Sequence, residues 1–436
     1  MQKPDFQEHI DSYYSASRND HRTYPALNGH LDVDTCIIGG GLAGIGTALP
    51  LAEAGHNVAL IEAARIGFGA SGRNGGQVLA GWAADSSTIA AASNTGTAQS
   101  LWQLSVDAVD LIDTRIRQHQ IDCDWQRGYA TVAIKPRHLQ ELRQARQEAE
   151  SVYGYHGQQE WSREQLQAQL GSTRYIGALY DPHAGHLHPL NYTLGLARAA
   201  TAAGAQLFEH TPMLSVAPHQ GGYRIRTPQG NIQAQRLVLA VNVFQHALQQ
   251  PLFQPITAKI LPVGTYIIAT EPLGERADGI IRNNMAVCDT RFVLDYYRLS
   301  ADKRLLFGGK VNYSGREPSR HTIEHSMRRD MLKVFPQLAD VRIDYAWGGH
   351  VDISMSRAPH FGRLAPNLYF MQGFSGHGVA ATGIGGQITA EAILGDDSRL
   401  RLFEQLRHRN FPGGTYLRLP SQWLGVGYYR LKDLLP

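Results

Sequence analysis

Residues 36–46 read CIIGGGLAGIG. The first three form a compact apolar run, which is typical of a buried parallel strand. Gly39, Gly41 and Gly44 then fit the spacing G-x-G-x-x-G. In that pattern the first glycine makes a tight turn, the second lets a pyrophosphate approach the backbone, and the third lets the helix pack closely on the strand. The stretch therefore predicts a dinucleotide-binding site.

A helix and a second strand follow this turn in the expected order. Leu42 and Ala43 open a helical pattern whose first N–H groups would face the phosphates. A second apolar run ends at Glu62, where a carboxylate can bind the ribose hydroxyls of an adenosine. Glu62 favours an unphosphorylated ribose, as in FAD or NAD, and we assign Ala63 and Arg65 to the same site.

One residue breaks the local pattern. Pro50 lies inside the predicted helix, where it cannot donate a hydrogen bond to the carbonyl of Gly46 and should kink the helix. Because Gly46 has no Cβ, it can relieve the clash with the proline ring. We interpret Pro50 as a tolerated irregularity.

The segment EAARIGFGASGRNGGQ, residues 62–77, favours FAD over NAD. A nicotinamide enzyme would normally continue with another strand–helix–strand unit, whereas this segment is rich in small and polar residues. Its backbone N–H groups and short side chains suit a ribityl chain and a flavin ring edge. The alternative is a flexible surface loop. The candidate cofactor contacts here are Ala70, Ser71, Arg73, Asn74, Gly75, Gly76 and Gln77.

A second glycine cluster lies in residues 367–395, NLYFMQGFSGHGVAATGIGGQITAEAILG. Residues 368–371 predict a strand and residues 379–394 a long helix. Two strand–glycine–helix elements can converge on one extended ligand. The second helix would then point its N-terminus at the pyrimidine edge of a flavin, where negative charge develops on reduction, and His377 could assist. The candidate contacts are Gly373, Ser375, Gly376, His377, Gly378 and Val379.

Length and composition limit the class of protein. A chain of 436 residues exceeds what one ordinary core supports, so we expect two domains. A formal charge of +3, from 41 basic and 38 acidic residues, argues against a nucleic-acid binder. Three cysteines are too few and too scattered for a disulfide framework. No apolar run reaches the roughly 18 residues of a spanning helix, so we expect a cytoplasmic protein without membrane contact.

Three histidines in DPHAGHLHPLNY, residues 181–192, raise the question of a metal site. His183, His186 and His188 fit no standard helix or finger spacing, and no cysteine or acid pair completes the set. We therefore predict that the protein has no metal site here.

Stretches along the chain resemble the D-amino-acid oxidase family of FAD-dependent oxidoreductases. Besides the glycine turns, they include GHLHPLNYTLG, LDYYRLSADKRLLFGG and SRAPHFGRL. The resemblance implies an α/β fold, in which a Rossmann-like FAD-binding domain is interleaved with an α+β substrate domain built on a mixed sheet. It assigns residues 1–95, 180–250 and 345–436 to the FAD-binding domain, and residues 96–179 and 251–344 to the substrate-binding domain.

The residue pattern itself agrees with this division. Residues 96–118, 137–150 and 190–203 predict helices, and the region 255–312 is strand-like. Val241 stands where the family usually has a glycine, which leaves the chain path nearby open.

The resemblance also implies the chemistry. A C–H bond next to nitrogen delivers a hydride to flavin N5, and water hydrolyses the imine that results. The neutral amine drives the electron flow, so we expect substrate anchors rather than a strong protein base. The cofactor is FAD, and we expect it to be bound without a covalent link because no cysteine lies in the C-terminal third of the chain.

The resemblance, together with the strand pattern, suggests roles for individual residues. Arg357 is the leading anchor, because amino-acid oxidising relatives have an arginine at the comparable place and a guanidinium group binds a carboxylate through two hydrogen bonds. The alternative is a surface arginine. Lys259 precedes a strand that relatives place near the flavin, where a cation could help oxygen accept electrons. His188 is a candidate pocket residue. Tyr296, Tyr297 and Arg298 lie on a predicted strand of the substrate domain, where they could line the pocket, with Tyr297 as the leading candidate, or could equally be cross-strand packing residues. Val216 falls where relatives contact the adenine through the backbone.

Several alternatives stay open at this point. The substrate is a small amine or amino acid, and L-pipecolate or another secondary amine is as compatible with an arginine anchor as a primary amine that carries a carboxylate. The electron acceptor could be oxygen, a quinone or a carrier protein. An FAD-binding protein without turnover is the alternative of a different class.

Overall fold

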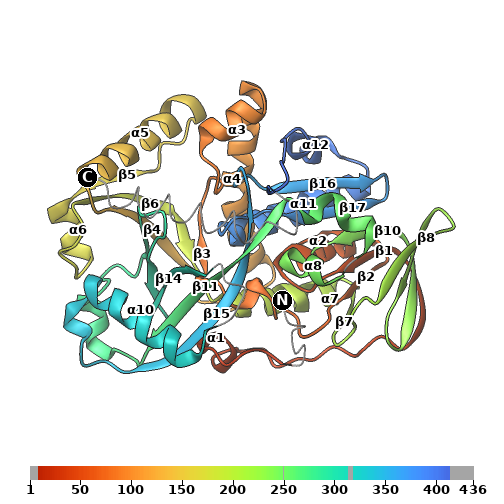
Figure 1. Cartoon of the computed structure of the whole chain (residues 1–436), viewed down its shortest axis with the longest axis horizontal. Helices are drawn as coiled ribbons and strands as arrows, with labels where there is room; N and C mark the ends of the chain where they lie inside the picture. Colours follow the sequence, from red (N-terminus) through yellow and green to blue (C-terminus); the bar gives the residue numbers. More distant parts are fainter. Residues whose placement is uncertain (1–7, 249, 313–317, 413–436) are drawn as a thin grey trace.

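Two mixed β-sheets organise the chain, and helices cover them (Figure 1). The structure is a computed structural model that describes residues 8–248, 250–312 and 318–412. In the first sheet six strands follow the order β16-β17-β10-β1-β2-β7, and the β8–β9 hairpin pairs with β10. Its strands are β1 (Gly29–Ile38), β2 (Val58–Ile61), β7 (Gln206–Phe208), β8 (Ser215–His219), β9 (Gly222–Arg226), β10 (Gly230–Leu239), β16 (His360–Ala365) and β17 (Leu368–Gln372).

The middle of this sheet is parallel. β1 pairs in parallel with β2 and β10, and β10 pairs in parallel with β17. Because parallel strands end at one edge of a sheet, the turns after β1 and β17 leave the same edge, with only β10 between them. The fold therefore brings the two glycine clusters to one place.

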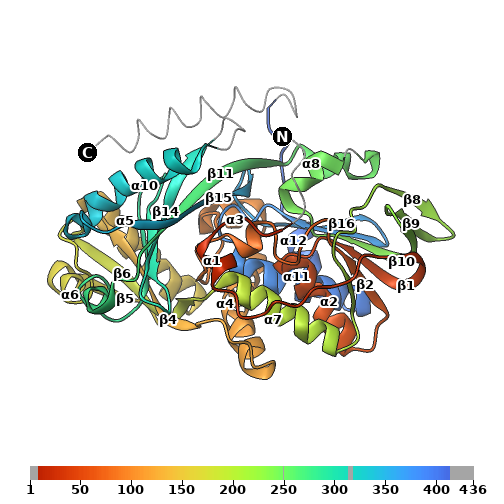
Figure 2. The same cartoon turned by 90° about the horizontal axis from the view of Figure 1, so that it is seen from below.

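Helices α2 (Leu42–Glu53), α7 (Pro189–Ala202) and α11 (Gly378–Leu394) pack side by side against this sheet (Figure 2). α2 continues through Pro50. The carbonyl of Gly46, which Pro50 cannot reach with a hydrogen bond, accepts one at 3.2 Å from Nη2 of Arg115. Arg115 is buried and belongs to the neighbouring helix α4 (Thr95–Gln118). A side chain from another helix thus replaces the bond that proline removes.

α2 and α11 touch backbone to backbone at Gly386. A Cβ there would lie 2.5 Å from the carbonyl carbon of Gly46 and 2.8 Å from the amide nitrogen of Thr47. We expect Gly386→Ala to lower the free energy of unfolding by about 2–3 kcal/mol, because the helices must move apart. Gly383→Ala is the matched control, since its Cβ would meet only the guanidinium of Arg115, at 3.8 Å. Thermal unfolding should show a lower Tm for Gly386→Ala but not for Gly383→Ala. Equal Tm values for the two variants would contradict the close contact between the helices.

Within the described residues, the second sheet has nine strands. Eight follow the order β15-β11-β14-β13-β12-β4-β6-β3, and β5 pairs with β6. β11 and β15 are long strands that run toward the first sheet (Figure 1). The strands are β3 (Gln77–Val78), β4 (Gln126–Ala133), β5 (Gln159–Ser162), β6 (Gly177–His186), β11 (Ile260–Thr270), β12 (Ala286–Asp289), β13 (Tyr296–Leu299), β14 (Leu305–Asn312) and β15 (Ile343–Ser354).

The two faces of this sheet are packed differently. One face is covered by helix α10 (Arg320–Val334) and carries a large apolar cluster that includes Tyr297 and Phe307. The opposite face carries a small cluster, which we call the inner-face cluster. Its members are Tyr129, Ala184, Ala286 and Cys288, with the partly buried Leu79, Leu294 and Tyr296 packed against them.

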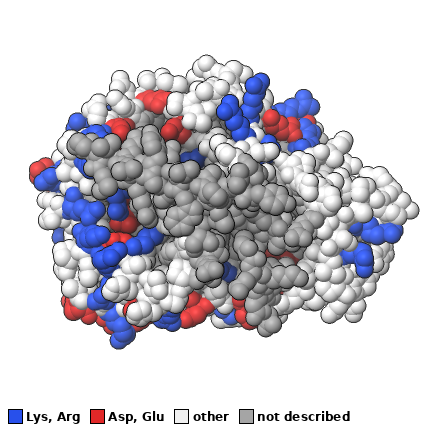
Figure 3. All heavy atoms as spheres, in the orientation of Figure 1, with Lys and Arg blue, Asp and Glu red and all other residues white. Residues whose placement is uncertain are grey.

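The observed elements confirm the predicted fold class and the predicted helices over 96–118, 137–150 and 190–203. The domain boundaries stay a prediction. No helix in the described ranges is both long and apolar enough to cross a membrane. Basic and acidic side chains are interspersed over the described part of the face in Figure 3. The remaining helices are α1 (Tyr13–Ala16), α3 (Ser86–Ala92), α5 (Pro136–Tyr153), α6 (Arg163–Gln169), α8 (Gln245–Leu248), α9 (Gln254–Thr257) and α12 (Ser398–Glu404), with 3-10 turns at Ala70–Gly72, Asn242–Phe244, Pro251–Phe253, Gly274–Gly279 and Pro336–Leu338.

Candidate active site

The turn after β1 has no room for side chains. Gly39 has a φ of +112°, and a Cβ there would lie 2.5 Å from the carbonyl oxygen of Ala240. A Cβ on Gly44 would collide with the carbonyl oxygen of Gly39. These contacts explain two glycines of the motif by the close approach of backbone to backbone.

The first turn of α2 presents free N–H groups at the edge of the sheet. The amide of Leu42 donates to Oγ of Ser71 at 2.9 Å. The amides of Ala43 and Gly44 have no hydrogen-bond partner in the described part of the chain. Together with the positive end of the helix dipole, these amides can bind an anion.

Glu62 lies at the end of β2, next to this turn. Its carboxylate accepts hydrogen bonds from the amide of Gly40, at 2.7 Å, and from the amide of Ala64, at 2.9 Å. Burial raises the pKa of Glu62, and these two bonds oppose the rise. The carboxylate therefore braces the glycine turn, and its contact with a ribose, like that of Ala63, stays a prediction.

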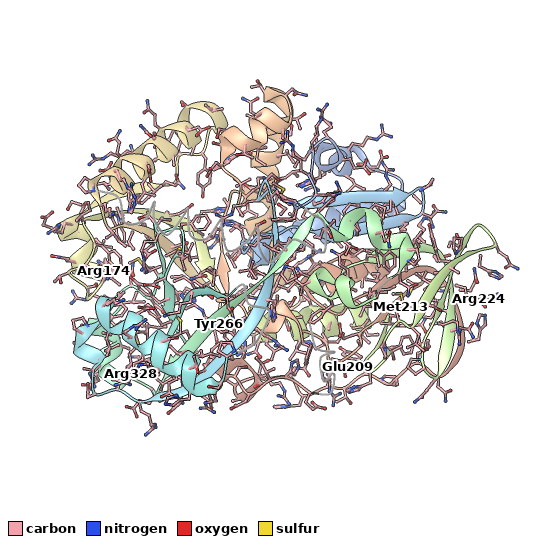
Figure 4. The ribbon with its side chains drawn as sticks, viewed as in Figure 1. Arg174, Glu209, Met213, Arg224, Tyr266 and Arg328 are labelled. Atoms are coloured by element: carbon pink, nitrogen blue, oxygen red, sulfur yellow. The ribbon has the colours of Figure 1, made fainter. Side chains whose placement is uncertain are left out.

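Two other predicted cofactor contacts have side chains engaged within the protein. Arg65 forms ion pairs with Glu8 at 2.7 Å and with Glu209, labelled in Figure 4, at 2.8 Å. Val216 pairs with Ile225 in the β8–β9 hairpin and packs against the core beneath the first sheet. A contact of the Val216 backbone with the adenine stays a prediction.

Asn74 fixes the loop of residues 67–77. Its Nδ2 donates to the carbonyl of Ala70 at 3.0 Å, and its Oδ1 accepts from the amide of Gly76 at 2.8 Å. Nε of Arg73 donates to the carbonyl of Phe68 at 2.7 Å, and the guanidinium lies 4.5 Å from the centre of that ring. The loop is thus a braced turn rather than the flexible segment considered as the alternative.

β13 meets this loop through Tyr296 and Arg298 rather than through Tyr297. Nε of Arg298 donates to the carbonyl of Gly75 at 2.8 Å, and a Cβ on Gly75 would lie 2.7 Å from the ring of Tyr296. Tyr297 points to the other face of the sheet, where it stacks on Phe307 at 5.5 Å. The structure therefore favours the packing role for Tyr297 and places Tyr296 at the candidate site.

The turn after β17 is organised by Asp352, a buried residue of β15 that sequence reasoning missed. Its carboxylate accepts hydrogen bonds from the amides of Gly373 and Phe374, and its carbonyl accepts from the amide of Ser375 at 2.8 Å. The side chain of Asn242 also hydrogen-bonds to the carboxyl group of Asp352. Burial raises the pKa of Asp352 to about 7. No sequence pattern around an isolated acidic residue in a strand indicates such a role.

Arg357 and His377 lie beside this turn. Arg357 is exposed, has a φ of +59°, and makes no ion pair with any described residue. Its guanidinium lies 5.9 Å from the ring centre of Phe292. Burial, and then the charge of Arg357, lower the pKa of His377 to about 4, while hydrogen bonds to the backbone of Leu79 and Ala80 oppose this shift. A strained, unpaired arginine beside a neutral histidine is typical of a ligand site.

His188 and Lys259 have other partners. His188 is buried at the N-terminus of α7, where Nδ1 accepts from the amide of Asn191 and Nε2 lies 3.1 Å from Oγ of Ser17. Both ring nitrogens are thereby used within the protein, so the structure does not support the predicted substrate contact. Nζ of Lys259 donates to the carbonyl of His408 at 2.6 Å.

A family model described as "FAD dependent oxidoreductase" matches residues 34–392. The chain belongs to this family. It is 44% identical to the probable oxidoreductase OrdL of Haemophilus influenzae, over 98% of both chains. It is 39% identical to gamma-glutamylputrescine oxidoreductase of Escherichia coli, over 98% of this chain and 99% of that one.

Solved structures of family members share the fold. Glycine oxidase from Geobacillus kaustophilus superposes with a TM-score of 0.74 at 19% identity, over 87% of this chain and all of that one. L-proline dehydrogenase from P. horikoshii gives a TM-score of 0.70 at 19% identity, over 84% of this chain and 94% of that one. This protein is accordingly an FAD-dependent oxidoreductase that acts on C–N bonds of amines or amino acids.

The residues at the sheet edge fit FAD. The unpaired amides of Ala43 and Gly44 suit the diphosphate. The turn of residues 373–378 is joined to the chain just after the loop of residues 70–77, because His377 hydrogen-bonds to the backbone of Leu79 and Ala80. Nε2 of His377 is buried without a hydrogen-bond partner among the described residues, as expected for an atom that binds a ligand.

Proposed function

We propose that this protein oxidises the terminal amine of gamma-glutamylputrescine. The carbon next to the nitrogen loses a hydride, and water converts the imine into an aldehyde and ammonia. Oxygen then accepts the two electrons and becomes hydrogen peroxide. The observation that carries the proposal is the 39% identity to gamma-glutamylputrescine oxidoreductase over nearly the full length of both chains.

The side chains at the site suit such a substrate. Arg357 has an exposed guanidinium without a carboxylate partner in the described structure, so it can bind the carboxylate of the glutamyl group. Leu79, Leu294 and Tyr296 offer an apolar wall for the methylene chain. FAD, when bound, supplies the acceptor for the hydride. His377, which is neutral at physiological pH, can accept or donate a hydrogen bond through its free Nε2.

We infer that the FAD is held without a covalent bond. Cys36, Cys123 and Cys288 are all buried in strands or loops of the protein interior, and none belongs to the two glycine turns. Acid precipitation should therefore release all of the flavin into the supernatant. Yellow colour that stays with the precipitate would contradict this inference.

Anaerobic stopped-flow reduction of the purified holoenzyme tests the proposed substrate. Gamma-glutamylputrescine, L-pipecolate, putrescine and a panel of amino acids are mixed with the enzyme while the flavin absorbance is followed. We expect rapid bleaching by gamma-glutamylputrescine. Faster bleaching by L-pipecolate would retain the family and replace the substrate. Measurement of hydrogen peroxide in air then tests oxygen as the acceptor.

A further inference from the structure

Two polar side chains, the half-buried Gln77 and the buried His186, face each other on β3 and β6, and each has one buried atom without a hydrogen-bond partner in the described structure. Gln77 and His186 are directly opposite in this antiparallel pair, so their side chains point to the same face of the sheet. Among the described residues, neither Nε2 of Gln77 nor Nδ1 of His186 has a partner. His186 is only 2% exposed. Leaving a buried donor or acceptor unpaired is unfavourable, and a ligand that pairs with it recovers that free energy.

The contacts of His186 define which of its nitrogens carries the proton. Nε2 lies 2.7 Å from the backbone carbonyl oxygen of Asn284, which can only accept, so Nε2 is the donor. Burial, and then the nearby charge of Arg298, lower the pKa of His186 to about 3. The ring is therefore neutral at physiological pH, and Nδ1 is a bare acceptor. The amide nitrogen of Gln77, by contrast, is a donor.

This donor–acceptor pair belongs to the candidate site. Gln77 directly follows Gly76 in the braced loop, and Leu79, two residues further on, packs against the inner-face cluster with Tyr296. The backbone of Leu79 also hydrogen-bonds to His377. Ala184, two residues before His186, belongs to the same inner-face cluster. The pair thus lies on the sheet face that meets the predicted flavin loop.

We propose that Gln77 and His186 recognise the amide bond of a gamma-glutamylated amine. Gln77 donates to the amide carbonyl oxygen, and Nδ1 of His186 accepts from the amide N–H. In an extended amide the C=O and the N–H point to opposite sides. An amide inserted between the two side chains can therefore accept a hydrogen bond from Gln77 and donate one to His186. This inference rests on the proposed function and deepens it, because it explains how the site distinguishes a gamma-glutamylated amine from a free one.

Two ligands that cannot be oxidised at a terminal amine test the inference. Gamma-glutamyl-n-butylamide keeps the amide, and gamma-glutamyl n-butyl ester lacks only the N–H. Their dissociation constants for the holoenzyme are measured by isothermal titration calorimetry. We expect the wild-type protein to bind the amide about 10- to 100-fold more tightly than the ester, since the ester leaves His186 unpaired.

The variants separate the two hydrogen bonds. His186→Phe keeps an aromatic ring of similar shape but has no acceptor, so the ratio of the two dissociation constants should fall below about threefold. Gln77→Met should weaken both ligands by about tenfold and leave their ratio unchanged. Because the ratio is internal to each variant, a general loss of affinity does not affect it.

The possible failures are distinguishable. If the wild-type protein binds neither ligand, the proposed substrate is wrong, and the inference falls with it. If the wild-type protein binds amide and ester equally, or if His186→Phe keeps the wild-type ratio, the inference is wrong while the proposed substrate stands.

Discussion

Arg357→Ala should reduce kcat/KM for gamma-glutamylputrescine by about 30- to 300-fold, because a guanidinium–carboxylate pair is joined by two charge-assisted hydrogen bonds. Arg357 is the exposed arginine beside the turn after β17, and its charge has no acidic partner within the described residues. Steady-state kinetics of hydrogen peroxide release or of flavin bleaching would measure the change. Arg357→Lys keeps the charge but not the planar fork, so we expect an intermediate loss of about tenfold.

Two comparisons make this prediction specific. Putrescine has no carboxylate, so its kcat/KM should change less than about threefold in Arg357→Ala. Arg363 is the control residue, because its guanidinium is already paired with Glu404 at 2.8 Å and Asp397 at 3.0 Å. Arg363→Ala should leave KM for the carboxylated substrate unchanged. An equal loss for putrescine and gamma-glutamylputrescine in Arg357→Ala would contradict a carboxylate anchor.

The local parts of the site could be predicted from the sequence because their signals are local. A strand, a glycine turn, a helix and an acid follow one another between residues 36 and 62, and each has its own composition. The second glycine turn has the same form. Their meeting at one sheet edge also follows from the sequence, once both strands are taken to be parallel.

The face to which a strand residue points could not be predicted in the same way. Tyr296 and Tyr297 are adjacent aromatic residues, and a shift of one residue exchanges their faces. The structure places Tyr296 against the loop at Gly75 and Tyr297 in the core beside Phe307. His188 illustrates a second difficulty, because the sequence does not distinguish a histidine that caps a helix from a histidine that binds a ligand.

The sequence gives even less indication of polar side chains that hydrogen-bond to backbone groups far away along the chain. Arg115 reaches the carbonyl of Gly46 from 69 residues away, and Asp352 binds the amide of Gly373 from 21 residues away. In both cases the partner is a backbone group, which every residue carries. The identity of the partner is therefore set by the tertiary fold and not by any motif.

Asp352→Ala should weaken FAD binding by about 30- to 100-fold. Without the carboxylate, the buried amides of Gly373 and Phe374 lose their acceptor, at a cost of about 1–3 kcal/mol each. The turn that leads into α11 then loses the shape in which it meets a flavin. Titration of the apoprotein with FAD, followed by quenching of flavin fluorescence, would measure the dissociation constant. Ser356→Ala, in the nearby loop after β15, is the control and should bind FAD normally.

Asp352→Asn should change the pH dependence of stability as well. Burial raises the pKa of Asp352 to about 7, whereas an aspartate in the unfolded chain loses its proton near pH 4. Between these values the folded protein holds a proton that the unfolded chain has released, so the free energy of unfolding falls as the pH rises from about 4 to about 7. Asparagine does not titrate and lacks this contribution. The Tm of the wild-type protein should therefore fall relative to that of the variant between pH 5 and pH 7, and parallel Tm curves would show that the Asp352 carboxyl group titrates normally in the folded protein.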